Sequence, residues 1–526
     1  MRETRWWFAV LVCLVALAPI AVSAADCDRR EPGLSTRYSD GWGITPDANR
    51  LQARTTIERS NAGTLQLAWA YGFGSKKPRT FPLVTEDTLF IADSGVGIVA
   101  LDRETGCTRW VRKQGGELGT AILYARIDDR DALVYNDRNG GVYAIDALTG
   151  ADIWHAAIVE QPIPMYSGTP TIQGQTVLVP ISSLEIGLAA NPLYGCCTTS
   201  GGMAAFDLQT GKELWFLPTI DKPPAPTEKH WLLVQEYGPS GAPVWGTPTV
   251  DVSRGVTYYG SGQNYSPPST TTSDAIFAVD IASGEKRWVR QFTENDTYNI
   301  ACDISRQHPN CPVQMGPDHD FGAPPVLVSR PGHPDVLVAG QKSGHVHGLD
   351  PETGEVRWSV RLGRGGALGG IHWGMAADAN RAVVYVPVSD VAAHPVDGKP
   401  APGLYALDVD TGETLWVHSR EDRCPDRICS GGLSAAITAT PEVVFAGSLD
   451  GYFSAYAADN GELLWTDDTW KDFDTVNGVP ASGGAFDAHG PMVADDMVIV
   501  SSGYDSFGEK GGNVLLVYRL GGEGAK

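Results

Sequence analysis

The amino-acid sequence predicts an all-β protein, a single eight-bladed β-propeller whose N-terminal and C-terminal strands pair to close the ring. Two observations predict this fold class. A ten-residue pattern ending in tryptophan recurs along the chain, and a lone strand pattern near the C-terminus matches an incomplete unit near the N-terminus. The composition agrees, because 61 glycines and 15 tryptophans in 526 residues suit many short strands and tight turns.

Charge and hydropathy exclude two other classes of protein. The formal net charge is −22, whereas nucleic-acid-binding proteins carry basic surface stripes. Hydrophobic residues make up 42% of the chain, which is too many for a disordered protein. We therefore expect a folded protein with no nucleic-acid partner.

Each copy of the repeat reads as an apolar strand, Asp, two variable residues, Thr-Gly or a variant, three more residues and Trp. An Asp followed four residues later by Gly is turn chemistry, and the apolar flanks predict a hairpin. The tryptophans follow each other at intervals of 41, 44, 61, 73, 70, 58 and 49 residues, typical of propeller blades. A large ring at one position in every unit predicts docking between neighbouring blades. The repeat tryptophans are Trp69, Trp110, Trp154, Trp215, Trp288, Trp358, Trp416 and Trp465.

Ring closure is predicted from the two ends of the repeat array. The segment TLQLAW, which ends at Trp69, has no strand before it, and GNVLLVYRL at 512–520 has no tryptophan. Pairing the two would complete one blade and remove unpaired strand edges. The alternative, a solenoid, would need polar caps at both ends, which the sequence lacks. We expect one propeller domain over residues 26–520 and a disordered tail at 521–526.

Residues 1–25 are typical of a cleaved secretory signal peptide. Arg2 and Arg5 precede an apolar run at 6–22, and small residues follow it. The alternative, an uncleaved membrane anchor, is disfavoured because the run has 17 residues and contains Pro19. We expect a periplasmic mature chain without a transmembrane segment.

An exported chain can form disulfides. Of nine cysteines, one lies in the predicted signal peptide, so eight remain. No Cys-x-x-Cys-His haem motif occurs, and no spacing resembles a zinc site. Three pairs are local in sequence and the fourth follows by elimination. The predicted pairs are Cys196/Cys197, Cys302/Cys311, Cys424/Cys429 and Cys27/Cys107.

The repeat, with its terminal closure, resembles that of the pyrroloquinoline quinone (PQQ) dehydrogenases over nearly all of the mature chain. Similar repeats occur in non-catalytic propellers, including an outer-membrane assembly lipoprotein, so a binding or assembly scaffold is the alternative function. The three longest intervals, 61, 73 and 70 residues, indicate inserted loops, where functional sites gather. Four motifs in this region favour the enzyme.

The first two motifs match the family's metal and cofactor contacts. In ISSLEIG, Glu185 stands where the family has a calcium-binding Glu, and Ser182 where it has a quinone contact. In APVWGTPTVD, Trp245 matches the tryptophan that stacks on the cofactor. The following GSGQN departs from the family, because Gln263 occupies the usual Asn position and Asn264 follows. Either amide oxygen suits a hard cation, so the second calcium ligand stays open between them.

The third motif, GPDHDFGAPPVLV, places Asp320 where the family has an Asp that is both calcium ligand and catalytic base. A competing placement puts Asn299 of TENDTYN at that position. We prefer Asp320 because the intervening segment carries a cysteine pair and resembles an inserted loop, and Asp318 is a nearby alternative. Lanthanide-using members carry a further Asp two residues beyond the base, where this chain has Gly322, so Ca²⁺ is favoured.

The fourth motif, AGQKSGHVHGLD, places Lys342 where the family has a cation on the quinone oxygens. In GGIHWGMAAD, His372 and Trp373 match a polar cofactor contact and an aromatic residue, and Ser167 in YSGTP is a further candidate anchor for cofactor carboxylates. The sequence at 137–140, Asp-Arg-Asn-Gly, copies the arginine version of the motif but lies in another blade. We interpret it as a turn.

The adjacent Cys196 and Cys197 follow Glu185 in NPLYGCCTTSGG. In the family's alcohol dehydrogenases the adjacent pair precedes the Glu. The order here resembles the polyvinyl-alcohol dehydrogenase branch, which also shares DTVNGVPASGG and the Gly-Asn-Val-Leu-Leu ending. Two interpretations stay open: a disulfide beside the substrate entrance, and a purely structural one.

The resemblance implies oxidation of a secondary or polymeric alcohol by hydride transfer to Ca²⁺-bound PQQ. Asp320 would remove the hydroxyl proton and Lys342 would stabilise the negative oxygen, with Ca²⁺ as Lewis acid. Because the chain has no haem motif, a separate soluble cytochrome c is the implied electron acceptor. The acidic surface would steer a basic partner.

Overall fold

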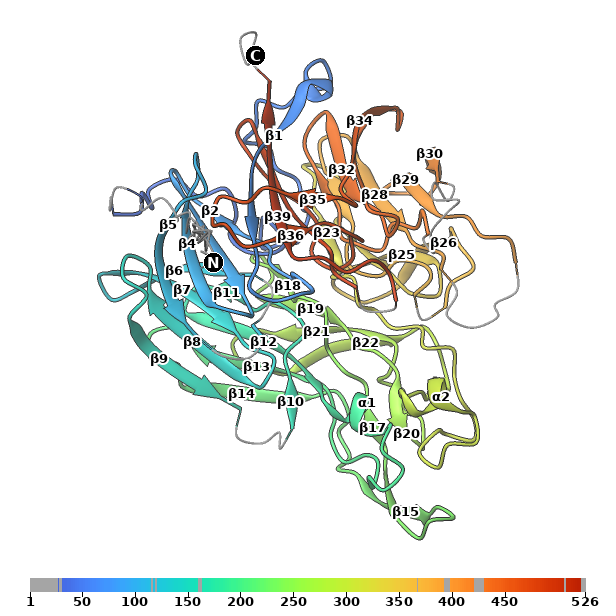
Figure 1. Cartoon of the computed structure of the whole chain (residues 1–526). Coiled ribbons are helices and arrows are strands. Elements are labelled where there is room, and N and C mark those ends of the chain that lie inside the picture. Colours follow the sequence, from blue (N-terminus) through green and yellow to red (C-terminus); the bar gives the residue numbers. More distant parts are fainter. Residues whose placement is uncertain are drawn as a thin grey trace, which may run out of the picture.

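The computed structural model describes residues 27, 31–114, 117–118, 121–158, 163–366, 368–391, 398–420, 430–505 and 508–521. Within these residues the strands form eight large antiparallel sheets arranged as the blades of a propeller (Figure 1). The predicted all-β fold with eight blades is therefore confirmed. The predicted signal peptide, the Cys424/Cys429 pair and residues 522–526 lie outside the described residues.

The strands of each blade run outward from the axis. The first four blades are β2 (Leu83–Val84), β3 (Thr88–Asp93), β4 (Gly97–Asp102) and β5 (Thr108–Lys113); β6 (Leu123–Ile127), β7 (Arg130–Asn136), β8 (Gly141–Asp146) and β9 (Asp152–Ala157); β10 (Pro164–Met165), β11 (Thr171–Gln173), β12 (Thr176–Ser183), β13 (Gly202–Asp207) and β14 (Glu213–Pro218); and β18 (Thr249–Asp251), β19 (Val256–Gly260), β21 (Ala275–Asp280) and β22 (Lys286–Gln291). The last four are β23 (Val326–Val328), β24 (Val336–Gly340), β25 (His345–Leu349) and β26 (Val356–Arg361); β27 (Ala376–Asp378), β28 (Val383–Val388), β29 (Gly403–Asp408) and β30 (Thr414–Ser419); β31 (Thr438–Ala439), β32 (Val443–Gly447), β33 (Tyr452–Ala457) and β34 (Leu463–Asp468); and β37 (Met492–Ala494), β38 (Met497–Ser502), β39 (Val514–Leu520) and β1 (Leu65–Gly72).

Smaller elements lie in the connections between strands. They are the pairs β15 (Ala225–Lys229) with β16 (Gln235–Gly238), β17 (Ser240–Gly241) with β20 (Asn264–Ser266) and β35 (Asp472–Phe473) with β36 (Ala481–Ser482), the 3-10 helix η1 (Ala62–Thr64), and the helices α1 (Glu185–Leu188) and α2 (Ala301–Ile304). The helix α1, the β15–β16 hairpin and α2 account for length in the three longest repeat intervals. In the part of the chain that is described, no helix is long and apolar enough to cross a membrane.

The repeat tryptophans join each blade to the next. The Trp154 indole N–H donates to the Leu208 carbonyl of the following blade at 2.9 Å, and the ring packs on Gly211 of that blade. Gly211 has a φ of +69°, and a Cβ there would lie 2.6 Å from the Trp154 ring. The same contact recurs along the array, so Trp and Gly of the repeat are two halves of one blade junction. The predicted docking role is confirmed by this packing.

The eighth blade combines both ends of the chain. The strand β39 pairs antiparallel with β1 from Leu65 opposite Leu520 to Gly72 opposite Val514. The preceding blade docks on the completed sheet, because the Trp465 indole N–H donates to the Leu65 carbonyl at 3.0 Å. The predicted closure by terminal strands is therefore confirmed.

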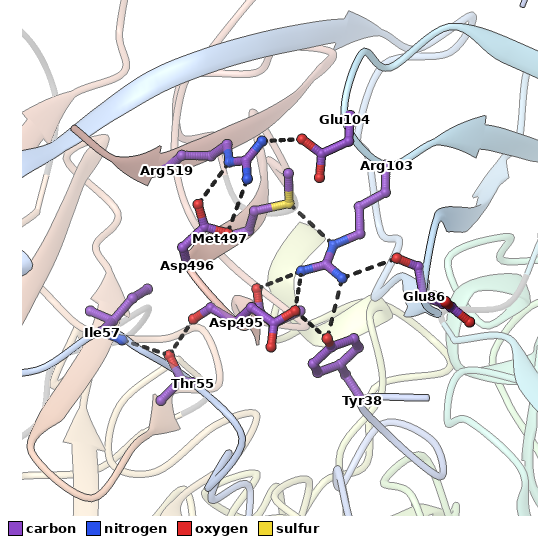
Figure 2. Close-up of polar contacts among 11 residues, drawn as sticks. Tyr38, Thr55, Ile57, Glu86, Arg103, Glu104, Asp495, Asp496, Met497 and Arg519 are labelled. Atoms are coloured by element: carbon purple, nitrogen blue, oxygen red, sulfur yellow. Dashed lines mark hydrogen bonds and ion pairs between the residues drawn. The ribbon is translucent and has the colours of Figure 1, made fainter. Parts of the chain in front are cut away.

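An ionic network seals the junction between the eighth blade and the first (Figure 2). Arg103, after β4, is largely buried and donates to the Asp495 carboxylate at 2.9 Å, in the turn between β37 and β38. Tyr38 of the N-terminal segment also donates to this carboxylate. Burial alone would raise the pKa of Asp495, but the hydrogen bonds from Tyr38 and Arg103 outweigh burial and lower it. On the outer side, Arg519 of β39 bridges Asp496 and Glu104.

The N-terminal segment also crosses the inner strands of four consecutive blades. Carbonyls at 46–50 accept hydrogen bonds of 2.7 to 3.0 Å from the backbone of β18, β23, β27 and β31. The segment is anchored by Arg50, whose buried guanidinium donates to the Trp42 and Ile437 carbonyls, both at 2.6 Å. These bonds hold the inner strands at fixed spacing around the axis.

Three disulfides are present in the described residues: Cys27–Cys107, Cys196–Cys197 and Cys302–Cys311. The three corresponding sequence predictions are confirmed.

We predict that Arg103→Ala destabilises the protein by about 2 kcal/mol, because it removes a buried partner of Asp495 and the link between the terminal blades. The matched control is Arg126→Ala, which removes an exposed ion pair with Asp131 and should cost less than about 1 kcal/mol. Urea denaturation midpoints compare the two. Equal losses in both variants would contradict the sealing role of Arg103.

Candidate functional site

A cavity of about 560 Å³ lies near the propeller axis. Most of its wall comes from segments next to the inner strands of the third to sixth blades. The sequence-predicted residues that line it are Ser167, Ser182, Trp245, Gln263, Asp318, Asp320, Lys342, His372 and Trp373. The fold therefore brings together residues that are as much as 206 positions apart in the sequence.

Asp320 is the centre of the polar contacts in the cavity. Its Oδ1 accepts a hydrogen bond from the Gln263 backbone N–H at 2.9 Å. Its Oδ2 accepts bonds from the Trp245 indole N–H and from the Lys342 ammonium, both at 3.0 Å. Three motifs that are separate in the sequence are thus joined at one carboxylate.

Lys342 is the cation of this cavity and is only 6% exposed. Its Nζ lies 3.0 Å from Asp320 Oδ2 and 3.3 Å from Asp318 Oδ1. Burial alone would lower the pKa of Lys342, but the Asp318 and Asp320 carboxylates outweigh burial and raise it. Burial raises the pKa of Asp318 well above its usual range. Lys342 is therefore charged at neutral pH.

A third carboxylate fixes the segment that carries Asp318 and Asp320. Asp296 accepts the backbone N–H of Asp318 at 3.1 Å and that of His319 at 2.8 Å. Burial raises the pKa of Asp296 to about 6. These bonds hold the Asp-His-Asp segment against the wall before β23 begins.

Trp245 forms a flat part of the cavity wall, and two glycines leave room for it and for Asp320. A Cβ on Gly322 would lie 1.8 Å from the Trp245 ring, and one on Gly262 would lie 2.5 Å from Asp320 Oδ1. Trp373 packs edge-on against Trp245 with ring centroids 5.2 Å apart. No side chain fits at position 322 while Trp245 keeps this place, so the further Asp of lanthanide-using relatives has no room here.

The remaining predicted contacts have different environments. Ser182 Oγ lies 3.5 Å from the Tyr265 hydroxyl at the cavity wall. His372 Nδ1 lies 2.7 Å from Ser434 Oγ, which donates to the Asp487 carboxylate at 2.6 Å. This chain orients the His372 ring, with the proton on Nδ1 assigned from the hydrogen-bond pattern.

The two amides left open by the sequence are separated by the structure. Gln263 lines the cavity, and its Oε1 is buried with no hydrogen-bond partner among the described residues. Asn264 belongs to β20, and its side chain bonds to the Ser240 carbonyl and to Thr270. Only Gln263 therefore offers an amide oxygen to the cavity.

Glu185 is buried but does not line the cavity. Its carboxylate accepts backbone N–H bonds from Thr198 and Thr199 at 2.7 to 2.9 Å, and further bonds from their hydroxyls and from Tyr194. The carboxylate thus holds the segment that follows the Cys196–Cys197 disulfide. Neither of these cysteines lines the central cavity.

The competing sequence placements lie elsewhere. Asn299 is buried, and its amide bonds to the Tyr265 and Asn310 carbonyls and to the Ala301 N–H, outside the cavity. Asp137 accepts the backbone N–H of Asn139 at 2.8 Å and of Gly141 at 2.9 Å, as the turn interpretation expects.

Several cavity residues were missed from the sequence. Arg79 is the most informative, because its Nε and Nη1 are buried without hydrogen-bond partners in the described residues, while Nη2 donates to the Tyr504 hydroxyl at 2.5 Å. It lies in a connecting segment, KKPRT, that belongs to no repeat. Tyr265 and Tyr298 also line the cavity and follow no motif.

A propeller whose axial cavity joins an acid, a lysine and a tryptophan defines a quinone-dependent dehydrogenase. The model of the glucose/ethanol/alcohol dehydrogenase β-propeller domain matches residues 40–361. The chain belongs to this PQQ family and is a PQQ-dependent alcohol oxidoreductase. A second model, outer membrane protein assembly factor BamB, matches residues 276–509.

Two similar proteins are polyvinylalcohol dehydrogenases. The protein from Pseudomonas sp. is 34% identical, and the alignment covers 96% of this chain and 81% of the relative. The protein from Sphingopyxis sp. (strain 113P3) is 35% identical, with 92% and 76% covered.

Solved structures share the fold. Quinohemoprotein alcohol dehydrogenase from Comamonas testosteroni superposes with a TM-score of 0.68 at 18% identity, covering 94% of this chain and 82% of that one. BamB from Moraxella catarrhalis gives a TM-score of 0.51 at 14% identity, covering 88% of this chain and 99% of that one.

The cavity fits PQQ, a planar quinone with three carboxylates. Its volume is within the range of small-molecule sites, Trp245 offers a flat apolar face, and Arg79 offers buried N–H groups without partners. The fit to Ca²⁺ is incomplete. Gln263 and Asp320 face the cavity, but the oxygens of Glu185 and Asn264 are bonded to protein groups. As arranged, these residues do not form a full calcium shell.

We predict that Gly322→Ala displaces the Trp245 ring and destabilises the protein by about 1–3 kcal/mol, because the added methyl overlaps that ring. Near-UV circular dichroism and the urea midpoint measure the change. The control is Gly187→Ala in α1, where a Cβ meets open space. An unchanged spectrum and midpoint in Gly322→Ala would contradict the packing described.

Proposed function

We propose that the protein oxidises secondary or polymeric alcohols to carbonyl compounds, using PQQ held in the central cavity. The observation that carries the proposal is the contact of Asp320 Oδ2 with both Lys342 Nζ and Trp245 Nε1 at 3.0 Å. It places a base, a cation and a flat ring at one point of the cavity. The polyvinyl-alcohol substrate class is supported by the names of the two relatives above.

Four residues would hold the cofactor. Trp245 provides a face for the planar ring system. Arg79 and Ser167 are placed to bind carboxylates, since charge-assisted bonds from a guanidinium are strong. Lys342 provides an ammonium for the quinone oxygens. When bound, PQQ supplies a quinone that accepts two electrons and a hydride.

Asp320 and Lys342 divide the proton and charge chemistry. Asp320 takes the proton of the substrate hydroxyl while the hydride leaves the carbinol carbon, so the product is a carbonyl compound. Lys342 stabilises negative charge that develops on oxygen in a water-poor cavity. The bond between these two residues fixes both groups before substrate binds.

Ca²⁺ stays a prediction of the family resemblance. It is supported by the unpaired Gln263 Oε1 beside Asp320, both oxygen donors that suit a hard cation. Binding with Glu185 as a ligand would require that carboxylate to give up its bonds to Thr198 and Thr199. No step above passes through the metal.

The remaining proposals concern the cell. The leader-like residues 1–25 support export to the periplasm. The lack of a Cys-x-x-Cys-His motif supports a separate soluble cytochrome c as electron acceptor. The net charge of −22 favours a basic partner.

We predict that cofactor-free protein, supplied with PQQ and Ca²⁺, reduces an electron-accepting dye with 2-pentanol or polyvinyl alcohol. Asp320→Asn should lower kcat at least about 100-fold, because the proton acceptor is lost. The matched variant Asp318→Asn should lose less than about tenfold. PQQ absorbance after gel filtration verifies loading of each protein.

Three outcomes would contradict this account. If the wild-type protein takes up no PQQ, the BamB-like match would favour a binding or assembly scaffold instead. Loaded wild-type protein that oxidises no alcohol would overturn the proposed activity. Loss of turnover in Asp318→Asn but not in Asp320→Asn would make Asp318 the base.

A further inference from the structure

A second cavity, of about 770 Å³, lies between the β15–β16 hairpin and the loop at 295–314. Both elements belong to the insertions that lengthen the middle blades, and β15, β20 and α2 lie together at one edge of the ring (Figure 1). The loop is a wall shared by the two cavities. Tyr298 and Ile300 line the central cavity, whereas Thr297 and residues 306–314 line the second.

The walls of the second cavity are braced by covalent and backbone bonds. The Cys302–Cys311 disulfide closes the loop. The hairpin is attached through Tyr237, whose N–H donates to the Cys196 carbonyl at 2.9 Å and whose carbonyl accepts the Cys197 N–H at 3.2 Å. Cys196 itself lines this cavity, so the adjacent-cysteine disulfide belongs to the second cavity and not to the central one.

The lining combines apolar surface with neutral hydrogen-bonding groups. Trp231 at the hairpin tip is 72% exposed, and Val313 on the opposite wall is 97% exposed. Asn310 is 95% buried, and its Oδ1 has no hydrogen-bond partner in the described chain, although its amide N–H groups donate to three carbonyls. His230 accepts the Leu232 N–H at Nδ1, which leaves the proton on Nε2, also buried without a partner in the described residues.

These groups indicate the chemistry of a ligand. An unpaired acceptor and an unpaired donor together match a hydroxyl group, which both donates and accepts. Exposed apolar side chains suit aliphatic carbon. The charged lining residues are two acids and two bases, Glu228, Glu236, Lys229 and Arg306, so no strongly charged polymer is favoured. A neutral chain with alternating carbon and hydroxyl groups fits this lining.

We propose that the second cavity is a distal subsite that binds the chain of a polyhydroxylated aliphatic substrate while one of its carbinol groups reacts in the central cavity. Only an extended molecule can occupy both sides of the loop at 295–314, so the subsite discriminates polymers from small alcohols. The inference rests on the proposed function for its reaction, but binding of the polymer does not require the cofactor.

The test uses Trp231→Ala, with Trp231→Phe as the conservative variant and Leu415→Ala as the control. Leu415 lies on β30, away from both cavities, and is 52% exposed. In PQQ-loaded protein, Trp231→Ala should raise KM for polyvinyl alcohol about tenfold, because exposed binding tryptophans contribute strongly to affinity. The kcat, and both constants for 2-pentanol, should stay within about twofold of the wild type. Trp231→Phe should restore most of the affinity.

A second readout is polymer binding to cofactor-free protein, measured by isothermal titration calorimetry with polyvinyl alcohol oligomers. The affinity should fall about tenfold in Trp231→Ala and stay unchanged in Leu415→Ala. The proposal is overturned if cofactor-free wild-type protein does not bind the oligomers, or if Trp231→Ala binds them as tightly as wild type. It is also overturned if KM rises equally for 2-pentanol. Absence of turnover in loaded wild-type protein would instead contradict the proposed function, and the calorimetric result would still decide the subsite.

Discussion

Pairing of β1 with β39 is the constraint on which the rest of the structure depends. A propeller blade buries its faces only against its neighbours, so a ring with one incomplete blade would expose two apolar faces and a strand edge. The Trp465 bond to the Leu65 carbonyl and the Arg103 network on Asp495 connect the completed blade on either side (Figure 2). The axial cavity inherits its shape from this closure, because four blades contribute its walls.

Within the cavity, one charged contact organises the chemistry. Two carboxylates, Asp318 and Asp320, share the single ammonium of Lys342, and the Trp245 indole donates to the same Asp320 oxygen. The arrangement is compact because Gly322 and Gly262 leave no side chain in the way. A base beside a cation and a flat ring is therefore set by backbone approach as much as by the functional side chains.

The sequence predicted the fold and much of the site for identifiable physical reasons. The Asp, Gly and Trp of the repeat make local turns and blade junctions, so the pattern itself determines eight blades. Asp320 and Lys342 lie close to inner strands, which places them at the axis. Orientation was less predictable: the direction of Glu185 depends on N–H groups of Thr198 and Thr199, and Arg79 belongs to no pattern at all. The second cavity arises from two insertions whose contact only tertiary structure defines.

The central claim is that the axial cavity binds PQQ against Trp245. Equilibrium titration of cofactor-free protein with PQQ, followed by tryptophan fluorescence, tests it most directly. The account predicts saturation at one PQQ per chain, an affinity at least about tenfold weaker in Trp245→Ala, and an unchanged affinity in Trp231→Ala. Equal affinity in wild type and Trp245→Ala, or no saturable binding, would contradict it.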